Sequence, residues 1–480
     1  MVRSTVLPYS FYSRRARFHA PLSRRVERSW RLPMRQPLPN LLASRNGRFA
    51  AFFLLYMTEG IPQGFTATAL AAQMRRQGVS AQQIGLFVAS LYLPWAWKWV
   101  VAPLVDLIHV RRWGHRRFWI LLCQLAMIGT LLLSMSVDFA TQLQLFTAII
   151  LVHNCFAATQ DVAIDGLACD VLSEQERGMA NGVMFSGAYL GNAVGGAGVL
   201  FLTAYCSLNL TFLFVMGCVG LVTVLVVLPM RESPTAAPIS ADRSAIREQL
   251  VDYFRAARHA FWPPRSSTVS GAARGPLLGV IFALLPAGSY ALGLALQSNL
   301  AVELGHNDHE IALLALFSTF NSALGCVLGG LLSDAWGRRR MLAVYIAATA
   351  IPTLWLASVM QHHHWISSID PTAQDIPAVP PMLIIDFWSA TLVFSLFQGL
   401  MYGTRTALFM DLCQPKVAAT QFTLYMALLN LTISYSASWQ GWAIDRWGYP
   451  TTLTADALLG LLGLALLPFL KRVAAAPSTA

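Results

Sequence analysis

Apolar runs long enough to cross a lipid bilayer recur along the whole chain after its first 46 residues. A helix needs about 20 predominantly apolar residues to span the hydrocarbon core, and in lipid only helices and closed barrels satisfy every backbone polar group. Only 12% of the 480 residues are charged and 56% are hydrophobic, whereas a soluble domain carries about 25% charged residues. We therefore predict an all-α integral membrane protein.

The apolar runs divide into twelve predicted membrane spans. The fourth and the tenth are longer than a bilayer requires, so we expect them to tilt or to protrude. An even number of spans places both termini on the same side. The spans cover approximately residues 47–74, 81–105, 118–137, 141–170, 179–204, 209–230, 275–302, 309–333, 341–360, 382–411, 420–443 and 451–470.

The distribution of positive charge predicts on which side of the membrane the two termini lie. Nearly all of the 34 Lys and Arg residues lie in the two tails or in alternate loops, and only Arg75, Arg76 and Arg446 lie in loops on the other side. Loops rich in Lys and Arg remain in the cytoplasm, so both termini are predicted to be cytoplasmic. The net charge of +11 reflects this topology and does not indicate nucleic-acid binding.

The N-terminal segment, residues 1–46, is rich in Arg and nearly free of acidic residues. It lacks the apolar region of a secretory signal, although a transit peptide would have a similar composition. We expect a cytoplasmic tail, or translation that begins at Met34.

Cysteine and histidine patterns predict no metal site. The seven Cys residues include no Cys-x-x-Cys pair, so neither a disulfide framework nor a zinc site is indicated. The run His362-His363-His364 is interpreted as a polar loop.

Two loops share the same sequence pattern, an Asp followed by a Gly and a cluster of Arg residues. Asp106 precedes an Arg cluster that contains Arg112 and a Gly, and Asp334 precedes Ala-Trp-Gly and the cluster that begins at Arg338. This pattern resembles the loop between the second and third helices of each half in the major facilitator superfamily. The resemblance implies twelve transmembrane helices in two pseudo-symmetric six-helix bundles. The corresponding boundaries are a tail at 1–46, bundles at 47–230 and 275–472, a cytoplasmic linker at 231–274 and a short tail at 473–480.

The linker contains a weaker helical pattern. Ile246, Leu250, Phe254 and Phe261 recur at near-helical spacing among Arg residues. This predicts either an amphipathic helix on the inner leaflet or a plain basic linker.

Further motifs narrow the resemblance. They are Glu59-Gly60-Ile-Pro62, the run Thr159-Gln160-Asp161-x-Ala-x-Asp165, and Leu412-Cys-Gln-Pro-Lys416-x-x-Ala419-Thr420-Gln421-Phe422. They are similar to the AmpG-like branch, which includes muropeptide permeases, siderophore importers and acetyl-CoA transporters. The residue after Asp165 and the long Arg-rich tail depart from the AmpG pattern.

In the superfamily, helices one, four, seven and ten line a central cavity, and polar residues share one face of each corresponding span here. This indicates a path for a polar solute. The substrate-binding candidates are Tyr56 and Gln63 on the first span, Asn154 and Gln160 on the fourth, Tyr290 and Gln297 on the seventh, and Gln398, Tyr402 and Arg405 on the tenth.

Carboxylates within an apolar helix indicate function. Asp161 and Asp165 lie four residues apart on one helix face, and two close carboxylates do not both stay ionised at low cost. Both are candidates for proton coupling, with Asp161 favoured because it lies about 15 Å from the helix end, and Glu59 is a further candidate. The structural alternative is an ion pair between these acids and Lys98 or Arg405.

Two intramembrane cations have more than one interpretation. Arg405 has the rigid bidentate geometry that suits a substrate carboxylate or phosphate, but it could equally neutralise Asp411 or a carboxylate of the fourth span. Lys98 is expected to pair with Glu59.

A second group of charged residues is expected to hold the cytoplasmic gate, because Asp106 and Asp334 lie close to Arg clusters. Ser173 and Glu176 form a capping-box pattern at the start of a helix. The gate candidates are Asp106, Arg112, Asp170, Arg177, Asp334 and Arg338.

These features predict a secondary active transporter of a bacterial-type inner membrane. We expect it to import, together with protons, a bulky polar or anionic organic solute such as a muropeptide or a siderophore by alternating access. The chain has no phosphate-binding loop, so the proton gradient is the expected energy source, without a cofactor. We expect a monomer in the lipid bilayer. The alternatives are an acetyl-CoA-type transporter, a membrane enzyme using His153 and Asp161, or a sensor without transport.

Overall fold

The computed structural model describes residues 39–107, 110, 114–172, 174–232, 251, 275–373, 377–413 and 418–470. Within these residues the secondary structure is almost entirely helical, which confirms the all-α fold. Several predictions lie outside the described residues: the tails 1–38 and 471–480, the amphipathic linker helix, Arg112 and Ser173. The side chains of Asp106 and Arg177 also lie outside the description.

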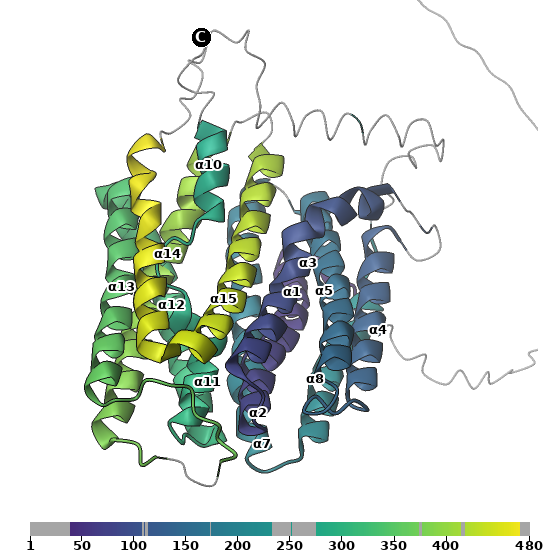
Figure 1. Cartoon of the computed structure of the whole chain (residues 1–480). Helices are drawn as coiled ribbons and strands as arrows, with labels where there is room; N and C mark the ends of the chain where they lie inside the picture. Colours follow the sequence, from purple (N-terminus) through teal and green to yellow (C-terminus); the bar gives the residue numbers. More distant parts are fainter. Residues whose placement is uncertain are drawn as a thin grey trace, which may run out of the picture. The chain divides into compact units, whose positions relative to one another are not determined.

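The first half consists of helices that gather on one side of the bundle (Figure 1). Their bounds are α1 Arg45–Gly64, α2 Ala71–Arg76, α3 Ala81–Leu107, α4 Arg116–Ser134, α5 Leu143–Val171, α6 Glu174–Ala193, α7 Val199–Thr203 and α8 Leu208–Val222. Short π-helical segments at Phe65–Leu70, Val194–Gly198 and Thr223–Val227 continue α1, α6 and α8.

The second half gathers on the other side. Its helices are α10 Gly275–Leu284, α11 Ala295–Glu303, α12 Asp308–Trp336, α13 Arg338–His362, α14 Pro381–Leu412 and α15 Ala418–Leu461. Short 3-10 turns at Ala291–Gly293, Leu462–Ala465 and Leu467–Phe469 complete it.

Each of the twelve predicted spans falls on helical segments of the described chain. Nine of the described helices are individually long and apolar enough to cross a membrane. Helix α15 supplies the last two spans, because the chain reverses at Gly448, whose φ of 77° is in the left-handed region. The first span is assembled from α1, α2 and the π-helical segment between them, and the seventh from α10 and α11.

The seventh span is broken, a feature that was not predicted from the sequence. Helix α10 ends before Pro286, which has no N–H to continue a helical hydrogen-bond ladder. The carboxylate of Asp456 on α15 binds the free backbone instead: it accepts the N–H groups of Tyr290 (2.9 Å) and Ala291 (3.0 Å), and also the Ser289 hydroxyl. The break is therefore stabilised by hydrogen bonds within the second half.

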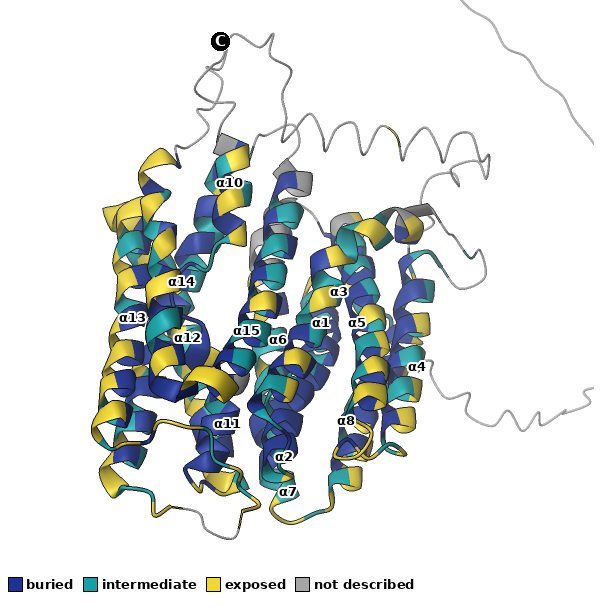
Figure 2. Cartoon of the chain, in the orientation of Figure 1, coloured by how far each residue is buried: buried dark blue, intermediate teal, exposed yellow. Residues whose placement is uncertain are grey.

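The pattern of buried and exposed residues is the one expected for a helical bundle in a lipid bilayer. Figure 2 shows buried residues between the helices and exposed residues on outward faces such as those of α13 and α4. Many exposed residues are large and apolar, for example Leu125, Phe320 and Val327. An apolar exterior of this extent suits lipid rather than water.

Helices α1 and α6 approach each other closely through small residues. A Cβ atom placed on Gly195 would lie 1.8 Å from the carbonyl oxygen of Ile61. Backbones that come this close leave room only for a hydrogen at that position.

Gly195→Ala is therefore expected to destabilise the first half by about 1–3 kcal/mol, the usual range for overpacking a tight contact. The measurement is the thermal unfolding midpoint of detergent-purified protein. The matched control is Gly217→Ala on α8, where an added Cβ meets nothing within 4 Å. Equal midpoints for the two variants would contradict the close approach.

Candidate functional site

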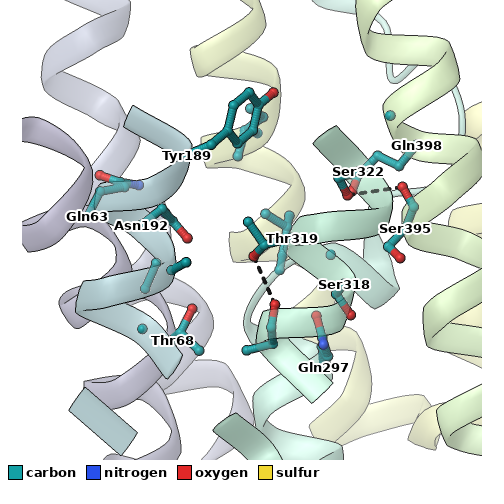
Figure 3. Close-up of a pocket in the computed structure, with 18 of the residues that line it drawn as sticks. Gln63, Thr68, Tyr189, Asn192, Gln297, Ser318, Thr319, Ser322, Ser395 and Gln398 are labelled. Atoms are coloured by element: carbon teal, nitrogen blue, oxygen red, sulfur yellow. Dashed lines mark hydrogen bonds between the residues drawn. The ribbon is translucent and has the colours of Figure 1, made fainter. Parts of the chain in front are cut away.

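A cavity of about 480 Å³ lies between the two halves, a size typical of small-molecule sites. Figure 3 shows polar side chains that face each other across it: Gln63 and Asn192 on one side, and Gln297, Ser322 and Gln398 on the other. Amide and hydroxyl groups on both walls can bind a solute rich in hydroxyl and amide groups.

Seven predicted site residues line this cavity. They come from three of the four spans that the superfamily pattern indicated, namely the first, the seventh and the tenth. They are Glu59, Gln63, Tyr290, Gln297, Gln398, Tyr402 and Arg405.

The candidates on the fourth span lie elsewhere. Asn154 donates to the Ile150 carbonyl one turn earlier in its own helix (3.1 Å), and Gln160 donates to the Thr58 hydroxyl (3.0 Å). Neither residue lines the cavity, and neither do Tyr56, Asp161 and Asp165. The polar stripe of α5 is used inside the first half, where Gln160 and Asp165 bind α1 and Asp161 binds Lys98 of α3.

Other cavity residues were not among the predicted candidates. Helix α6 contributes Tyr189 and Asn192, and α12 contributes Ser318, Thr319 and Ser322. The Tyr189 hydroxyl reaches across to the Cys326 sulfur of the other half, at 3.7 Å. Spacings of three and four residues between these side chains were available as a signal, because they place polar groups on one helix face.

Arg405 is the most deeply buried charge on the cavity wall, with 1% of its surface exposed. Its Nη1 donates to the Tyr290 hydroxyl at 2.7 Å, and the guanidinium carbon lies 5.7 Å from the centre of the Tyr402 ring. Its Nε has no hydrogen-bond partner among the described residues. The alternative pairing with Asp411 is wrong, because Asp411 binds Arg338 instead, at 2.8 Å.

Lys98 on α3 is the centre of an acidic cluster inside the first half. Its Nζ lies 2.5 Å from Asp161 and 3.8 Å from Asp165, and the Tyr56 hydroxyl donates to Asp165 at 2.6 Å. The expected direct pair between Lys98 and Glu59 is not formed; Asp161 takes that place, as the structural alternative anticipated. Glu59 is an electrostatic neighbour of the cluster.

The carboxyl groups around Lys98 lie in different environments, one partly exposed and one on the cavity wall. The side chain of Asp161 is 7% exposed and that of Asp165 is 47% exposed. Glu59 lines the cavity, and its Oε1 has no hydrogen-bond partner among the described residues. One lysine faces three carboxyl groups, so full ionisation of all three would leave two negative charges without a counter-charge.

A network of ion pairs joins the halves at one end of the bundle, the end at which α2, α7 and α11 terminate (Figure 1). Arg75 donates to Glu303 through Nε (2.9 Å) and Nη2 (2.6 Å). The Ser368 hydroxyl, the Ile369 N–H and the Tyr449 hydroxyl also donate to Glu303, at 2.7–2.9 Å. The pair is buried and every acceptor of the carboxylate is engaged.

A second pair lies beside the first. Arg76 contacts Asp308 at 2.7 Å, and Asp308 also accepts from Gln73 (3.0 Å) and Thr203 (2.9 Å). We call Arg75, Arg76, Glu303 and Asp308 the latch. These residues join the two halves at one end of the bundle, and the prediction of gate residues missed them because their partners are more than 200 positions away in the chain.

The opposite end, where α1 and α10 begin, carries ion pairs that stay within one half. Arg338 binds Asp334 (2.9 Å) and Asp411, and Arg116 binds Asp170 (3.1 Å). Glu176 of the predicted capping box contacts Arg48 at 2.5 Å. Among the described residues, no hydrogen bond joins the two halves at this end.

Comparison with known proteins agrees with this architecture. A profile of the Major Facilitator Superfamily matches residues 49–287 and 277–480. Two solved structures share the fold: a D-xylose–proton symporter (TM-score 0.67, 11% identity, 88% of this chain and 98% of that chain) and an inward-open xylose transporter from E. coli (TM-score 0.63, 12% identity, 91% and 98%). The chain belongs to the major facilitator superfamily.

Sequence relatives place it within the superfamily. The putative transporter AmpG 4 of Rickettsia conorii is 24% identical over 435 residues, which cover 88% of this chain and 96% of that protein. The anhydromuropeptide permease of Escherichia coli K12 is 23% identical over 430 residues, which cover 88% and 79%. The chain is thus an AmpG-like integral membrane protein and a secondary transporter, which confirms the predicted class and excludes the membrane enzyme.

Proposed function

We propose that this protein imports a bulky polar organic solute of the muropeptide type across the inner membrane, driven by the proton gradient. The cavity between the halves, closed at one end by the latch, carries this proposal, because alternating access requires a central site that opens to one side at a time. Its amide and hydroxyl lining suits a sugar–peptide solute, and the similarity to an anhydromuropeptide permease supports the same substrate class.

The proposed orientation follows from charge. In the sequence, most of the Lys and Arg residues belong to the segments that connect to the end where α1 and α10 begin, so we propose that this end, with both termini, lies in the cytoplasm. The latch then closes the external side, and the structure corresponds to a state that faces the cytoplasm. The protein is proposed to act as a monomer without a cofactor.

The proposed proton carrier is the Lys98 cluster. Asp161 holds Lys98 in a buried ion pair, Asp165 provides the partly exposed side and Glu59 provides the side that faces the cavity. A proton that binds to this cluster changes the pairing of Lys98 and thereby the contacts between α1, α3 and α5. A change in these contacts is a local event that can bias the two arrangements of the halves.

Uptake of labelled anhydromuropeptide into proteoliposomes tests this function. We expect accumulation when the outside is acidic relative to the inside, and only equilibration when the two sides have the same pH. A proton ionophore should abolish the accumulation. Binding without uptake would favour a sensor, and uptake of a ferric siderophore or of acetyl-CoA alone would replace the substrate class.

A further inference from the structure

We propose that Arg405, Tyr290 and Tyr402 form a binding site for one carboxylate of the transported solute. The proposal rests on the function proposed above, because it concerns the same cavity, and it adds a chemical requirement for the solute. The hydrogen bonding of Arg405, the charge of the cavity wall and the two flanking rings support it.

The guanidinium of Arg405 lacks the partner that a buried cation needs. Buried charges are normally paired, because removal from water is costly, and yet no described carboxylate lies within ion-pair distance of Arg405. Its protein hydrogen bond is to a neutral hydroxyl, and its Nε is left free. An anion bound in the cavity would complete this set of donors.

The flanking rings position the cation. The guanidinium carbon lies 6.0 Å from the Tyr290 ring centre and 5.7 Å from that of Tyr402, distances at which a ring face attracts a cation. The planar fork of an arginine held in this way matches a carboxylate through two parallel hydrogen bonds.

The charge of the described cavity wall limits the ligand to a single negative charge at this place. Among the described lining residues, Arg405 is the sole cation and Glu59 the sole carboxyl group. A phosphate monoester carries about two negative charges at neutral pH and would remain partly uncompensated here. The wall therefore favours a monocarboxylate over the several phosphates of acetyl-CoA.

A thiol in the same cavity allows a test that needs no substrate. Cys326 lines the cavity, and both Cys326 and Arg405 are electrostatic neighbours of Tyr402. In a variant that retains only Cys326, an anionic methanethiosulfonate should form a mixed disulfide with the thiol, releasing methanesulfinate, faster than its cationic analogue does. Arg405→Gln should lower this ratio of rates by about tenfold or more, as expected for a charge in a poorly solvated cleft.

The controls separate charge from folding. Arg446→Gln removes an exposed arginine that stacks on Trp442 outside the cavity and should leave the ratio unchanged. Arg405→Lys keeps the charge and should retain most of the ratio. An unchanged ratio in Arg405→Gln, in protein with a normal unfolding midpoint, would overturn the anion site.

A matched pair of ligands tests the carboxylate itself. The probes are an anhydrodisaccharide that carries a single L-alanine with a free carboxylate and the corresponding L-alanine amide. The carboxylate should bind wild-type protein at least about tenfold more tightly, as expected for a bidentate charged pair, and Arg405→Gln should abolish the preference. Equal binding of both probes by wild-type protein would overturn the inference. If neither probe bound, the proposed substrate class would fail, and the thiol experiment would still decide the anion site.

Discussion

Replacing Glu303 by glutamine is expected to open the end of the cavity that the latch closes and to raise thiol labelling from that side by about 100-fold or more. Removal of one partner from a buried ion pair costs about 3–5 kcal/mol, and each 1.4 kcal/mol changes an equilibrium about tenfold. When the latch is open, Arg75 is solvated by water and does not need Glu303. The loss of the Glu303 charge therefore destabilises the closed latch only.

The measurement uses Ser318→Cys as the one remaining cysteine, because Ser318 lies on the cavity wall. A membrane-impermeant maleimide is applied to intact cells from outside. The matched control is Arg76→Gln, whose side chain is 31% exposed in its pair with Asp308, compared with 4% for Arg75. The Arg76–Asp308 pair is more exposed than the Arg75–Glu303 pair, and ion pairs in contact with solvent contribute only about 0.2–1 kcal/mol, so labelling should change only a few-fold. Equal effects of the two variants would contradict the role of burial.

Asp161→Asn is the second change with a large expected effect. We expect it to abolish accumulation driven by a pH gradient while exchange of substrate across the membrane continues. The reason is that Asp161 is the closest partner of Lys98, at 2.5 Å, whereas Asp165 lies 3.8 Å away. An amide does not release a proton, so the cluster loses its coupling group while the cavity wall is untouched.

The double variant Lys98→Met with Asp161→Asn distinguishes coupling from structure. The single variant leaves a lysine without its main partner, which is destabilising, whereas removal of both charges of a buried pair is often close to neutral. Recovery of the unfolding midpoint without recovery of gradient-driven accumulation would support a coupling role. Recovery of both would show that the pair is structural. The measurements are uptake and counterflow in proteoliposomes, together with thermal unfolding.

The fold was predictable because its signals are local. Apolar runs of sufficient length define the spans, and the two Asp–Gly–Arg loops relate the halves, so neither required knowledge of distant contacts. The break in the seventh span was missed for the opposite reason. Pro286 was visible, but the carboxylate that satisfies the interrupted backbone belongs to Asp456, far along the chain.

The site was predictable only in part. The helix face predicted from residue spacing correctly placed Gln63, Gln398 and Arg405 on the cavity wall. It was insufficient for the fourth span, because a polar stripe can face either a cavity or a neighbouring helix, and α5 pairs with Lys98 of α3. The latch could not be predicted from the sequence, because its ion pairs join residues from different halves.

The broken seventh span also connects the cavity wall with the latch. Tyr290, which binds the guanidinium of Arg405, and Glu303, which holds Arg75, belong to one short continuous segment that consists of a turn and the nine-residue helix α11. Asp456 holds the start of this segment in place through the N–H groups of Tyr290 and Ala291. A change at the Tyr290–Arg405 contact and a change at the Arg75–Glu303 pair therefore act on the same short segment of the chain.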